Sequence, residues 1–317
     1  MRVCLWCPHA CAQDTAAALT PPPPCAQLPV ARGRVRDGDA RVAARALVLL
    51  HRCTRLSPDG AGEFVREARG ALRRPLRGDG AVALAMTAAH LMADVALAVT
   101  RAAAADRDAA ALGGGDRAGG ADAEPEGVEC HRAVAAAVQG IVPELVAVVS
   151  AVVSRSLPHE SDFQGVPAPW LLMRAARLLG VVCGAGAGME VAGAEACGAL
   201  AEAARVADSG GDVGRAVTYE VVRALARLVG APADAVGLAA DATARFFRLG
   251  TPTMRAVGVA CVEAHVALHP GAVAEHQMDL LDCFETGDDT LRVRVMEVML
   301  RVMAPGNADV VRGFVLR

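Results

Sequence analysis

One helical motif recurs three times in the C-terminal third of the chain, at a nearly constant interval. Arg215-Ala-Val, Arg255-Ala-Val and Arg292-Val-Arg stand at equivalent points of three apolar runs, 40 and 37 residues apart. An interval of this length is typical of a repeat that consists of two or three helices. A single pair of helices cannot bury its apolar faces alone, so consecutive pairs have to stack on one another. The repeat therefore restricts this part of the chain to a row of stacked helix hairpins.

The composition extends this prediction to the rest of the chain. Apolar residues make up 54% of the 317 residues, but aromatic residues only 3%, so the core is built from Ala, Val and Leu. Alanine is the best helix former, and the β-branched residues form no alternating runs of the kind that strands show. Gly, Pro and Asp punctuate the apolar segments. The helices that we expect span residues 39–56, 61–76, 80–101, 128–156, 168–183, 189–208, 213–229, 232–249, 253–268, 272–285, 288–303 and 306–317.

The segment 288–303 shows why stacking is needed. Its apolar residues form two stripes, one with Leu291, Val295, Val298 and Val302, the other with Val293, Met296, Leu300 and Met303. A helix that is apolar over most of its surface needs neighbours on several sides. Asp79, Asp212 and Asp289 stand where a carboxylate can accept the free N–H groups of a helix start. These patterns predict an all-α fold, a right-handed α-solenoid of HEAT/armadillo-type helix pairs.

Two low-complexity tracts divide the chain. Residues 1–38 contain Pro21–Pro24 and form no convincing element, so we interpret them as a disordered leader. Residues 102–127 are rich in Gly, and we interpret them as a flexible insertion. The predicted solenoid that contains this insertion covers residues 39–317. The stretches Ala81–Thr100 and Ala133–Val153 approach the length of a membrane span. Because Ala and Val dominate them, we interpret both as buried helices and expect no transmembrane segment.

Charge and cysteine usage exclude several classes of protein. The net charge is −3, which argues against a nucleic-acid-binding protein, although residues 1–100 carry 13 Arg against 8 acidic residues. Of the ten cysteines, six lie in apolar helical patterns, where thiols behave as small hydrophobic groups. This usage suits a reducing compartment. The six are Cys53, Cys130, Cys183, Cys197, Cys261 and Cys283.

Two clusters have the residue types of a metal site. Cys4-x-x-Cys7-x-x-x-Cys11 contains His9, but no second Cys pair completes a set of four ligands. His265 and His269 are one helical turn apart, with His276 in the next helix, but there is no Glu in the H-E-x-x-H position. The favoured interpretation is that these histidines sit at a helix C-terminus, where partial positive charge is stabilising.

The remaining candidate sites have structural explanations as well. Residues 184–188 alternate Gly and Ala but follow a helix rather than a strand and precede no Lys-Ser/Thr, so they indicate a helix–helix turn rather than a phosphate loop. Arg73, Arg74 and Arg77 form a small basic cluster that is compatible with an acidic partner, but a solvated loop is favoured. The sequence thus predicts no catalytic, cofactor-binding or metal-binding residues, and a protein that is not an enzyme.

Four stretches resemble one family of helical proteins. The first is Leu157–Gly180, above all Asp162-Phe163 and the turn Val166–Trp170, in which the prolines set the entry into a helix and Trp170 anchors it against its neighbour. The others are Ala216–Leu225, Met254–Pro270 and Ala274–Met303, the last with His276-Gln277, Asp282-Cys283 and Asp288–Leu291. In this order they resemble the trunk of the large adaptin subunits of adaptor-protein complexes, most of all the epsilon type of the fourth complex, with gamma adaptin second. Weaker similarity covers residues 41–100.

The resemblance implies a structural subunit of a heterotetrameric coat complex that sorts membrane cargo at the trans-Golgi network. The implied partners are beta-, mu- and sigma-type adaptor subunits, and the implied location is cytoplasmic, peripheral on Golgi membranes. In the family, Arf-class GTPases and anionic membranes contact mainly the start of the trunk. By the resemblance, we expect this chain to lack that part, along with the hinge and the ear. The alternative is a generic HEAT/armadillo scaffold, such as a relative of coatomer or of nuclear-transport proteins.

Overall fold

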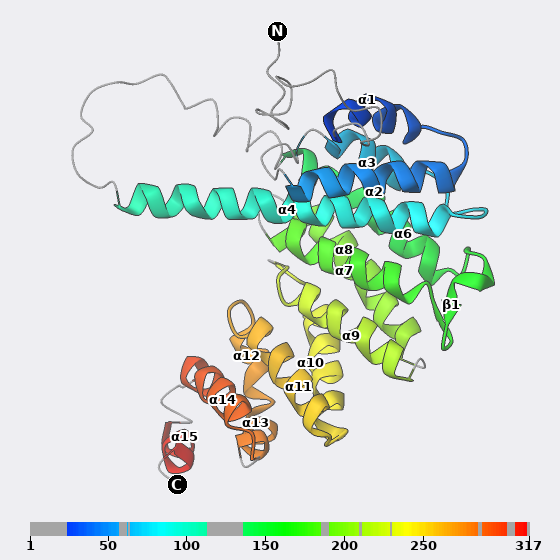
Figure 1. Ribbon diagram of the computed structural model, residues 1–317. Coiled ribbons are helices and arrows are strands. Elements are labelled where there is room, and N and C mark those ends of the chain that lie inside the picture. Colours follow the sequence, from blue (N-terminus) through cyan, green and yellow to red (C-terminus); the bar gives the residue numbers. More distant parts are fainter. Residues whose placement is uncertain are drawn as a thin grey trace. The chain divides into compact units, whose positions relative to one another are not determined.

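The computed structural model describes residues 24–56, 62, 64–112, 136–184, 190–208, 211–228, 230–284, 287–302 and 308–315. The chain divides into two compact units, one ending at Ser161 and one beginning at Asp162. Within the described residues nearly every element is a helix (Figure 1). The all-α solenoid class predicted from the sequence is therefore confirmed.

The first unit is built on helices that pack against one another in neighbouring pairs. Helix α2 contacts α1 and α4, while α3 contacts α4 and α6. The elements of this unit are α1 (Pro24–Arg34), α2 (Ala40–Leu56), α3 (Val65–Leu72), α4 (Ala81–Leu112), α6 (Val142–Val153) and the short 3₁₀ helix η2 (His159–Ser161). The core between α2 and α4 consists of fully buried leucines and alanines, among them Leu47, Leu50, Leu84 and Ala88.

Helix α1 corrects the expectation that residues 1–38 hold no element. The guanidinium of Arg32 lies 4.9 Å from the centre of the Phe64 ring, and its Nε is 3.4 Å from the carboxylate of Glu67. Arg74 donates hydrogen bonds of 2.8 Å to the carbonyl oxygens of Asp37 and Gly38. These contacts join the segment before α2 to α3. Composition did not reveal them because they depend on residues that lie more than 30 positions further along the chain.

Helix α4 also departs from the sequence prediction. It was expected to end at residue 101, but it continues to Leu112, which is 11 residues into the segment predicted as a flexible insertion. Alanine makes up most of this extension, and its high helix propensity explains the continuation. The predicted helix 128–156 is represented by α6 and by helical residues 136–139, which are separated by a turn at Gly140 and Ile141. Residues 113–135 lie outside the described part.

Two helical segments of this unit, Ala81–Arg101 and Ala136–Val153, are long and apolar enough to cross a membrane by length and composition alone. Core helices of soluble proteins meet the same criterion, so this finding is weak evidence for a membrane span. In the first segment, 50% of the most apolar window is buried inside the fold, and in the second 39%. Asp94 of α4 has a polar partner within the unit, because its carboxylate lies 2.7 Å from the Nε2 of His51 on α2.

A buried carboxylate joins α3 to α6. Glu144 is only 9% exposed, and its Oε1 accepts hydrogen bonds from the Nε atoms of Arg69 and Arg73, at 2.9 and 2.7 Å. Burial alone would raise the pKa of Glu144, but the hydrogen bonds from the two arginines outweigh it and hold the pKa below its ordinary value. Glu144 is therefore ionised at neutral pH and links two helices that are about 70 residues apart in the chain.

The second unit shows the solenoid arrangement most clearly. Helix α9 contacts α7 and α11, and α11 contacts α14, so these four helices form one layer. Helix α10 contacts α8 and α12, which form the opposite layer. The helices of this unit are α7 (Pro169–Gly184), α8 (Glu190–Ala207), α9 (Gly211–Leu225), α10 (Ala233–Arg248), α11 (Pro252–His265), α12 (Pro270–Ala274), α13 (Gln277–Phe284), α14 (Asp289–Val302) and α15 (Ala308–Val315).

The repeated arginines occur in a single layer, as the interval between them predicts. Arg215, Arg255 and Arg292 belong to α9, α11 and α14, each of which contacts the next. The layer is also joined by an ion pair, in which Arg294 on α14 places two nitrogens 2.8 and 2.5 Å from the carboxylate oxygens of Glu263 on α11. The predicted helix 272–285 is replaced by the end of α12 and by α13, which a turn at Glu275 and His276 separates.

Two details of α14 differ from the prediction. The carboxylate that caps this helix is that of Asp288, which accepts the N–H groups of Thr290 and Leu291, while Asp289 pairs with Arg292. Of the two apolar stripes, the one with Leu291, Val295 and Val298 is buried. In the other, Val293 is 51% and Leu300 55% exposed, so the part of the chain described here does not bury the helix on all its sides.

The entry into α7 is a short hairpin. Strands β1 (Asp162–Phe163) and β2 (Val166–Pro167) pair antiparallel around Gln164 and Gly165. Both turn residues have positive φ values, of 50° and 80°, as a type I′ hairpin turn requires. Pro169 is the first residue of α7, where its missing N–H leaves no helical hydrogen bond unmade, so the predicted role of the proline is confirmed.

Trp170 does not anchor α7 against another helix. Its side chain is 55% exposed and its ring lies 6.1 Å from that of Phe163, which is 48% exposed, so the two aromatic residues contact each other at the surface. The next residue, Leu171, is fully buried. Trp170 therefore faces the solvent and Leu171 faces the core. The sequence alone does not distinguish the two, because both residues are large and apolar.

This pair of neighbours provides a matched test. We expect Trp170→Ala to lower the free energy of unfolding by about 1 kcal/mol or less, because only a surface aromatic contact is lost. The variant Leu171→Ala should lower it by about 2–5 kcal/mol, because it leaves a cavity in the core. Urea denaturation followed by circular dichroism measures both values. Equal losses in the two variants would contradict the orientation of α7.

Candidate binding site

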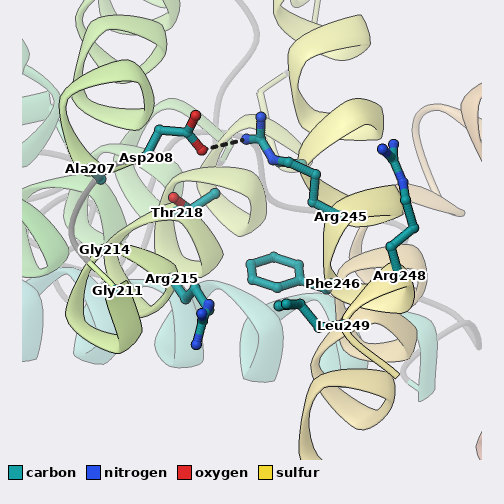
Figure 2. A pocket seen from close by; sticks show the side chains of 11 residues that line it. Ala207, Asp208, Gly211, Gly214, Arg215, Thr218, Arg245, Phe246, Arg248 and Leu249 are labelled. Atoms are coloured by element: carbon teal, nitrogen blue, oxygen red, sulfur yellow. Dashed lines mark ion pairs between the residues drawn. The ribbon is translucent and has the colours of Figure 1, made fainter. Parts of the chain in front are cut away.

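A cavity of the second unit lies where three helices end or begin (Figure 2). It has a volume of about 360 Å³. The C-terminal end of α8 and the first turns of α9 form one side, and the C-terminal half of α10 forms the other. The lining residues are Ala207, Asp208, Gly211, Gly214, Arg215, Thr218, Ala242, Arg245, Phe246, Arg248 and Leu249.

Two glycines allow α9 to begin beside the end of α8. A Cβ atom on Gly214 would collide with the carbonyl oxygen of Ala207, so any larger residue at this position would push α9 away. Gly211 starts α9 with a φ of 56°, in the left-handed region that favours glycine. Gly214 thus sets how closely α9 approaches the end of α8, and so the width of the cavity on this side.

The charged groups of the cavity are mostly arginines. Arg245 lies 3.4 Å from the carboxylate of Asp208, the ion pair drawn in Figure 2, and Arg215 pairs with Asp212 in the first turn of α9. Arg248 has no ion-pair partner among the described residues. Three arginines and one aspartate line the cavity, which gives the lining a net charge of +2. At neutral pH the cavity therefore attracts anionic groups.

The middle of the cavity is apolar. Phe246 is nearly buried and Leu249 is 44% exposed, and in Figure 2 both side chains lie between Arg215 and Arg248. Ala207 and Ala242 complete the apolar lining. Cationic groups around an apolar centre make this cavity amphipathic.

The histidines considered from the sequence lie together, but they are not arranged as metal ligands. His265 and His269 have ring centres 6.1 Å apart, and the Nδ1 of His265 lies 2.9 Å from the carbonyl oxygen of Cys261. No group of three or more His, Cys, Asp or Glu residues is placed to hold a metal ion in the described part of the chain. Burial lowers the pKa of His265. His265 is the last residue of α11, so its predicted place at a helix C-terminus is confirmed, and burial favours the neutral form of its imidazole.

The other candidates from the sequence are structural or lie outside the described residues. In the basic cluster, Arg73 binds Glu144 and Arg74 binds the carbonyls of Asp37 and Gly38, whereas Arg77 is exposed. The cluster thus holds helices together rather than presenting three free cations. The Cys4–Cys11 motif and residues 185–188 of the alternating Gly and Ala segment lie outside the described residues.

The thiols predicted to be structural are buried. Five of the six are buried, namely Cys53, Cys183, Cys197, Cys261 and Cys283. Cys130 lies outside the described part. Burial raises the pKa of Cys183 and Cys283 to about 11 and that of Cys261 to about 12. These thiols are protonated at neutral pH and are poor nucleophiles.

Sequence reasoning did not find the amphipathic cavity. Its signal in the sequence is short: Arg245 and Arg248 flank two phenylalanines at the end of a helix. This pattern is also typical of an ordinary helix C-terminus, where arginines complement the helix dipole. The partners from α8 and α9 become visible only when the helices are placed side by side.

Comparison with known proteins gives three relatives of one kind, although no family model matches the chain. The AP-4 complex subunit epsilon of Arabidopsis thaliana is 25% identical over 171 residues, which are 54% of this chain and 18% of that protein. AP-4 complex subunit epsilon-1 of Homo sapiens is 23% identical over 166 residues, which are 52% of this chain and 14% of that protein. The mouse subunit of the same name is 22% identical over 171 residues.

These similarities support the resemblance to a large adaptin subunit of the epsilon type. They span about half of this chain and less than a fifth of each relative's length. Among solved structures, an engineered protein aligns over 87% of this chain with 15% identity and a TM-score of 0.26, which is too low to show a common fold.

Proposed function

We propose that this chain, which resembles an epsilon-type large adaptin, is a structural subunit of a heterotetrameric adaptor complex in vesicle-mediated protein transport. Its partners would be a beta-type large subunit, a mu-type subunit and a sigma-type subunit. The complex would sort membrane cargo at the trans-Golgi network, on the cytoplasmic face of the membrane. In this role the chain has no catalytic activity of its own.

The observation that carries the proposal is the similarity to three epsilon subunits in a chain made of stacked helix pairs. Stacked pairs expose long surfaces on which partner domains can be buried. The apolar residues that stay exposed suit such contacts. Val293 and Leu300 on α14 and the Phe163–Trp170 pair before and in α7 are all about half exposed. Exposed apolar groups of this size are typical of interaction surfaces when they are contiguous.

Co-expression tests the proposal directly. The full chain would carry an affinity tag and would be produced together with beta-, mu- and sigma-type adaptor subunits from the same organism. We expect the tag to recover all three subunits in equal amounts, in a complex that remains intact in gel filtration. Fluorescence microscopy of the tagged chain should show it on trans-Golgi membranes.

The control is a HEAT-repeat chain of similar length from an unrelated protein, produced with the same three subunits. It should recover none of them. Recovery of coatomer or nuclear-transport proteins in place of adaptor subunits would instead support the generic scaffold. Failure of the folded chain to bind any of the three subunits would contradict the proposal.

A further inference from the structure

Another cavity, which we call the α3–α6 groove, lies within the first unit between the turn that follows α3 and one face of α6. Its volume is about 390 Å³, within the range of about 300–1,000 Å³ that is common for binding sites. Pro143, Ala147 and Ala151 line it from α6, where their spacing places them on one face of the helix. Pro75 and Leu76 line it from the turn after α3. The lining is therefore mostly apolar.

Glu144 gives the α3–α6 groove an unpaired acceptor. This residue lines the groove and is only 9% exposed. Its Oε1 accepts both arginine hydrogen bonds, whereas its Oε2 is buried and has no hydrogen-bond partner among the described residues. Such an oxygen needs an explanation, because buried polar atoms are nearly always paired. The last torsion of a glutamate is broad, so a small rotation can turn Oε2 toward an occupant of the groove. An occupant with a hydrogen-bond donor would supply the missing partner.

The charges of the α3–α6 groove restrict the kind of donor. Arg73 and Arg74 line it together with Glu144, which gives the lining a net charge of +1. Arg69 places a further positive charge 2.9 Å from the carboxylate. A lysine or arginine of a partner would meet these cations and be repelled. An ionised carboxylate has no hydrogen to donate to Oε2. The donor that fits is therefore a neutral one.

The open side of the α3–α6 groove favours an inserted side chain over a small molecule. Pro75, Pro143 and Ala147 are exposed, so an occupant would stay in contact with solvent on one side. Sites for small molecules bury most of the ligand surface. Protein interfaces instead place an aromatic side chain in a depression of this kind. Among neutral side chains that donate, tryptophan has the largest apolar body, and its indole N–H only donates.

We propose that the α3–α6 groove binds a tryptophan side chain of a partner protein. The indole N–H would donate to Oε2 of Glu144, and the ring would lie on Pro143 and Ala147. Burial of the ring would remove apolar surface of both partners from water, which is favourable. This site does not depend on the adaptor role, because its residues belong to the first unit of this chain alone.

A phage-displayed library of random peptides tests the proposal with the full chain. We expect the selected peptides to include a group that shares a tryptophan. In fluorescence anisotropy, replacing this tryptophan by 3-benzothienylalanine should weaken binding about tenfold. The replacement keeps the shape of the indole but lacks its N–H, so a hydrogen bond to a charged acceptor is lost. Equal binding of the two peptides would overturn the proposal.

Ala147→Arg and Ala83→Arg are a matched pair that locates the binding. Both alanines are exposed in helices of the first unit, but only Ala147 lines the α3–α6 groove. The side chain introduced by Ala147→Arg would fill the groove, and it would lie one turn from Glu144, with which it can pair. Ala147→Arg should weaken binding of the tryptophan peptides at least tenfold. Ala83→Arg adds the same charge and should change their binding less than twofold. Equal losses in the two variants would contradict the proposed site.

Glu144→Gln tests the hydrogen bond itself. In this variant the amide oxygen is needed by the arginines, so the amide nitrogen would face the indole N–H. The preference for the tryptophan peptide over the benzothienylalanine peptide should therefore fall from about tenfold to nearly none. A general loss of stability would weaken both peptides alike and leave this preference unchanged. Circular dichroism melting of each variant shows whether it is folded at the temperature of the measurement.

Three other results would overturn the proposal. The library could yield no binding peptides, or the peptides that Ala147→Arg weakens could lack tryptophan. Those peptides could also be rich in Asp and Glu, which would assign the α3–α6 groove to anions bound by Arg73. Failure to recover adaptor subunits would leave all of these measurements unchanged, so this proposal and the proposed function fail independently.

Discussion

Replacing Gly180 by leucine is expected to lower the free energy of unfolding by about 2–3 kcal/mol, the cost of inserting a large side chain into a well-packed contact. Gly180 lies on α7 where this helix crosses α9. A Cβ atom at this position would be 2.7 Å from the Cα of Ala224 and 3.0 Å from its Cβ. The first distance is shorter than real Cβ contacts, and backbone atoms cannot rotate away. The two helices would have to separate, which would disturb the layer that continues into α11.

Gly198→Leu is the matched control for this prediction. Gly198 is exposed in α8, and a Cβ atom there would meet no atom within 4 Å. Leucine has a higher helix propensity than glycine, so this variant should be as stable as the wild type or more stable by up to about 1 kcal/mol. Urea denaturation of the two variants measures the contrast. A Gly180→Leu variant with an unchanged midpoint would show that α7 and α9 are not in close contact.

Replacing Glu144 by glutamine should lower the free energy of unfolding as well, and the size of this effect should depend on pH. The variant keeps the shape of the side chain but removes the charge that accepts hydrogen bonds from Arg69 and Arg73. Hydrogen bonds to charged groups contribute more than neutral ones. Both arginines are partly exposed, which reduces their contribution. At pH 7 we expect a loss of about 1–2 kcal/mol in the free energy of unfolding.

The pH dependence follows from the lowered pKa of Glu144. In the unfolded chain this carboxyl titrates near its ordinary value of 4.5, and in the folded chain it titrates below that value. The unfolded state therefore binds the proton first as the pH falls, and the stabilisation is lost below about pH 4.5. The difference in urea midpoint between the wild type and Glu144→Gln should shrink between pH 7 and pH 3.5. A difference that stays constant over this interval would contradict the ionised bridge. Glu160→Gln is a suitable control, because Glu160 is exposed.

The helices of the second unit could be predicted from the sequence because local signals agree there. Gly, Pro and Asp stand at the breaks, and the arginine repeat gives the spacing of helix pairs. The starts of α7, α10 and α11 differ from the predicted ones by one residue each. Pro169 and Pro252 fix two of these starts, since proline is favoured in the first turn of a helix and excluded from its interior.

The errors arose where the outcome depends on distant residues. Trp170 and Leu171 are both large and apolar, and only the position of the neighbouring helices decides which of them is buried. The segment before residue 39 looked featureless, but Phe64 and Glu67 give Arg32 of α1 its partners. The sequence did not predict the amphipathic cavity for the same reason, since its lining residues come from three helices. The periodicity of the sequence indicates which residues share one face of a helix, but the neighbouring helices decide whether that face is buried.

The bridge between α3 and α6 has a consequence for how the chain can be altered by evolution or by engineering. Glu144 and its two arginines fix α6 to α3 through side chains that lie about 70 residues apart in the chain. Loss of both arginines would leave a buried carboxylate without its ion-pair partners, which is costly. A redesign of α3 or α6 therefore has to keep the three side chains together or replace all three at once.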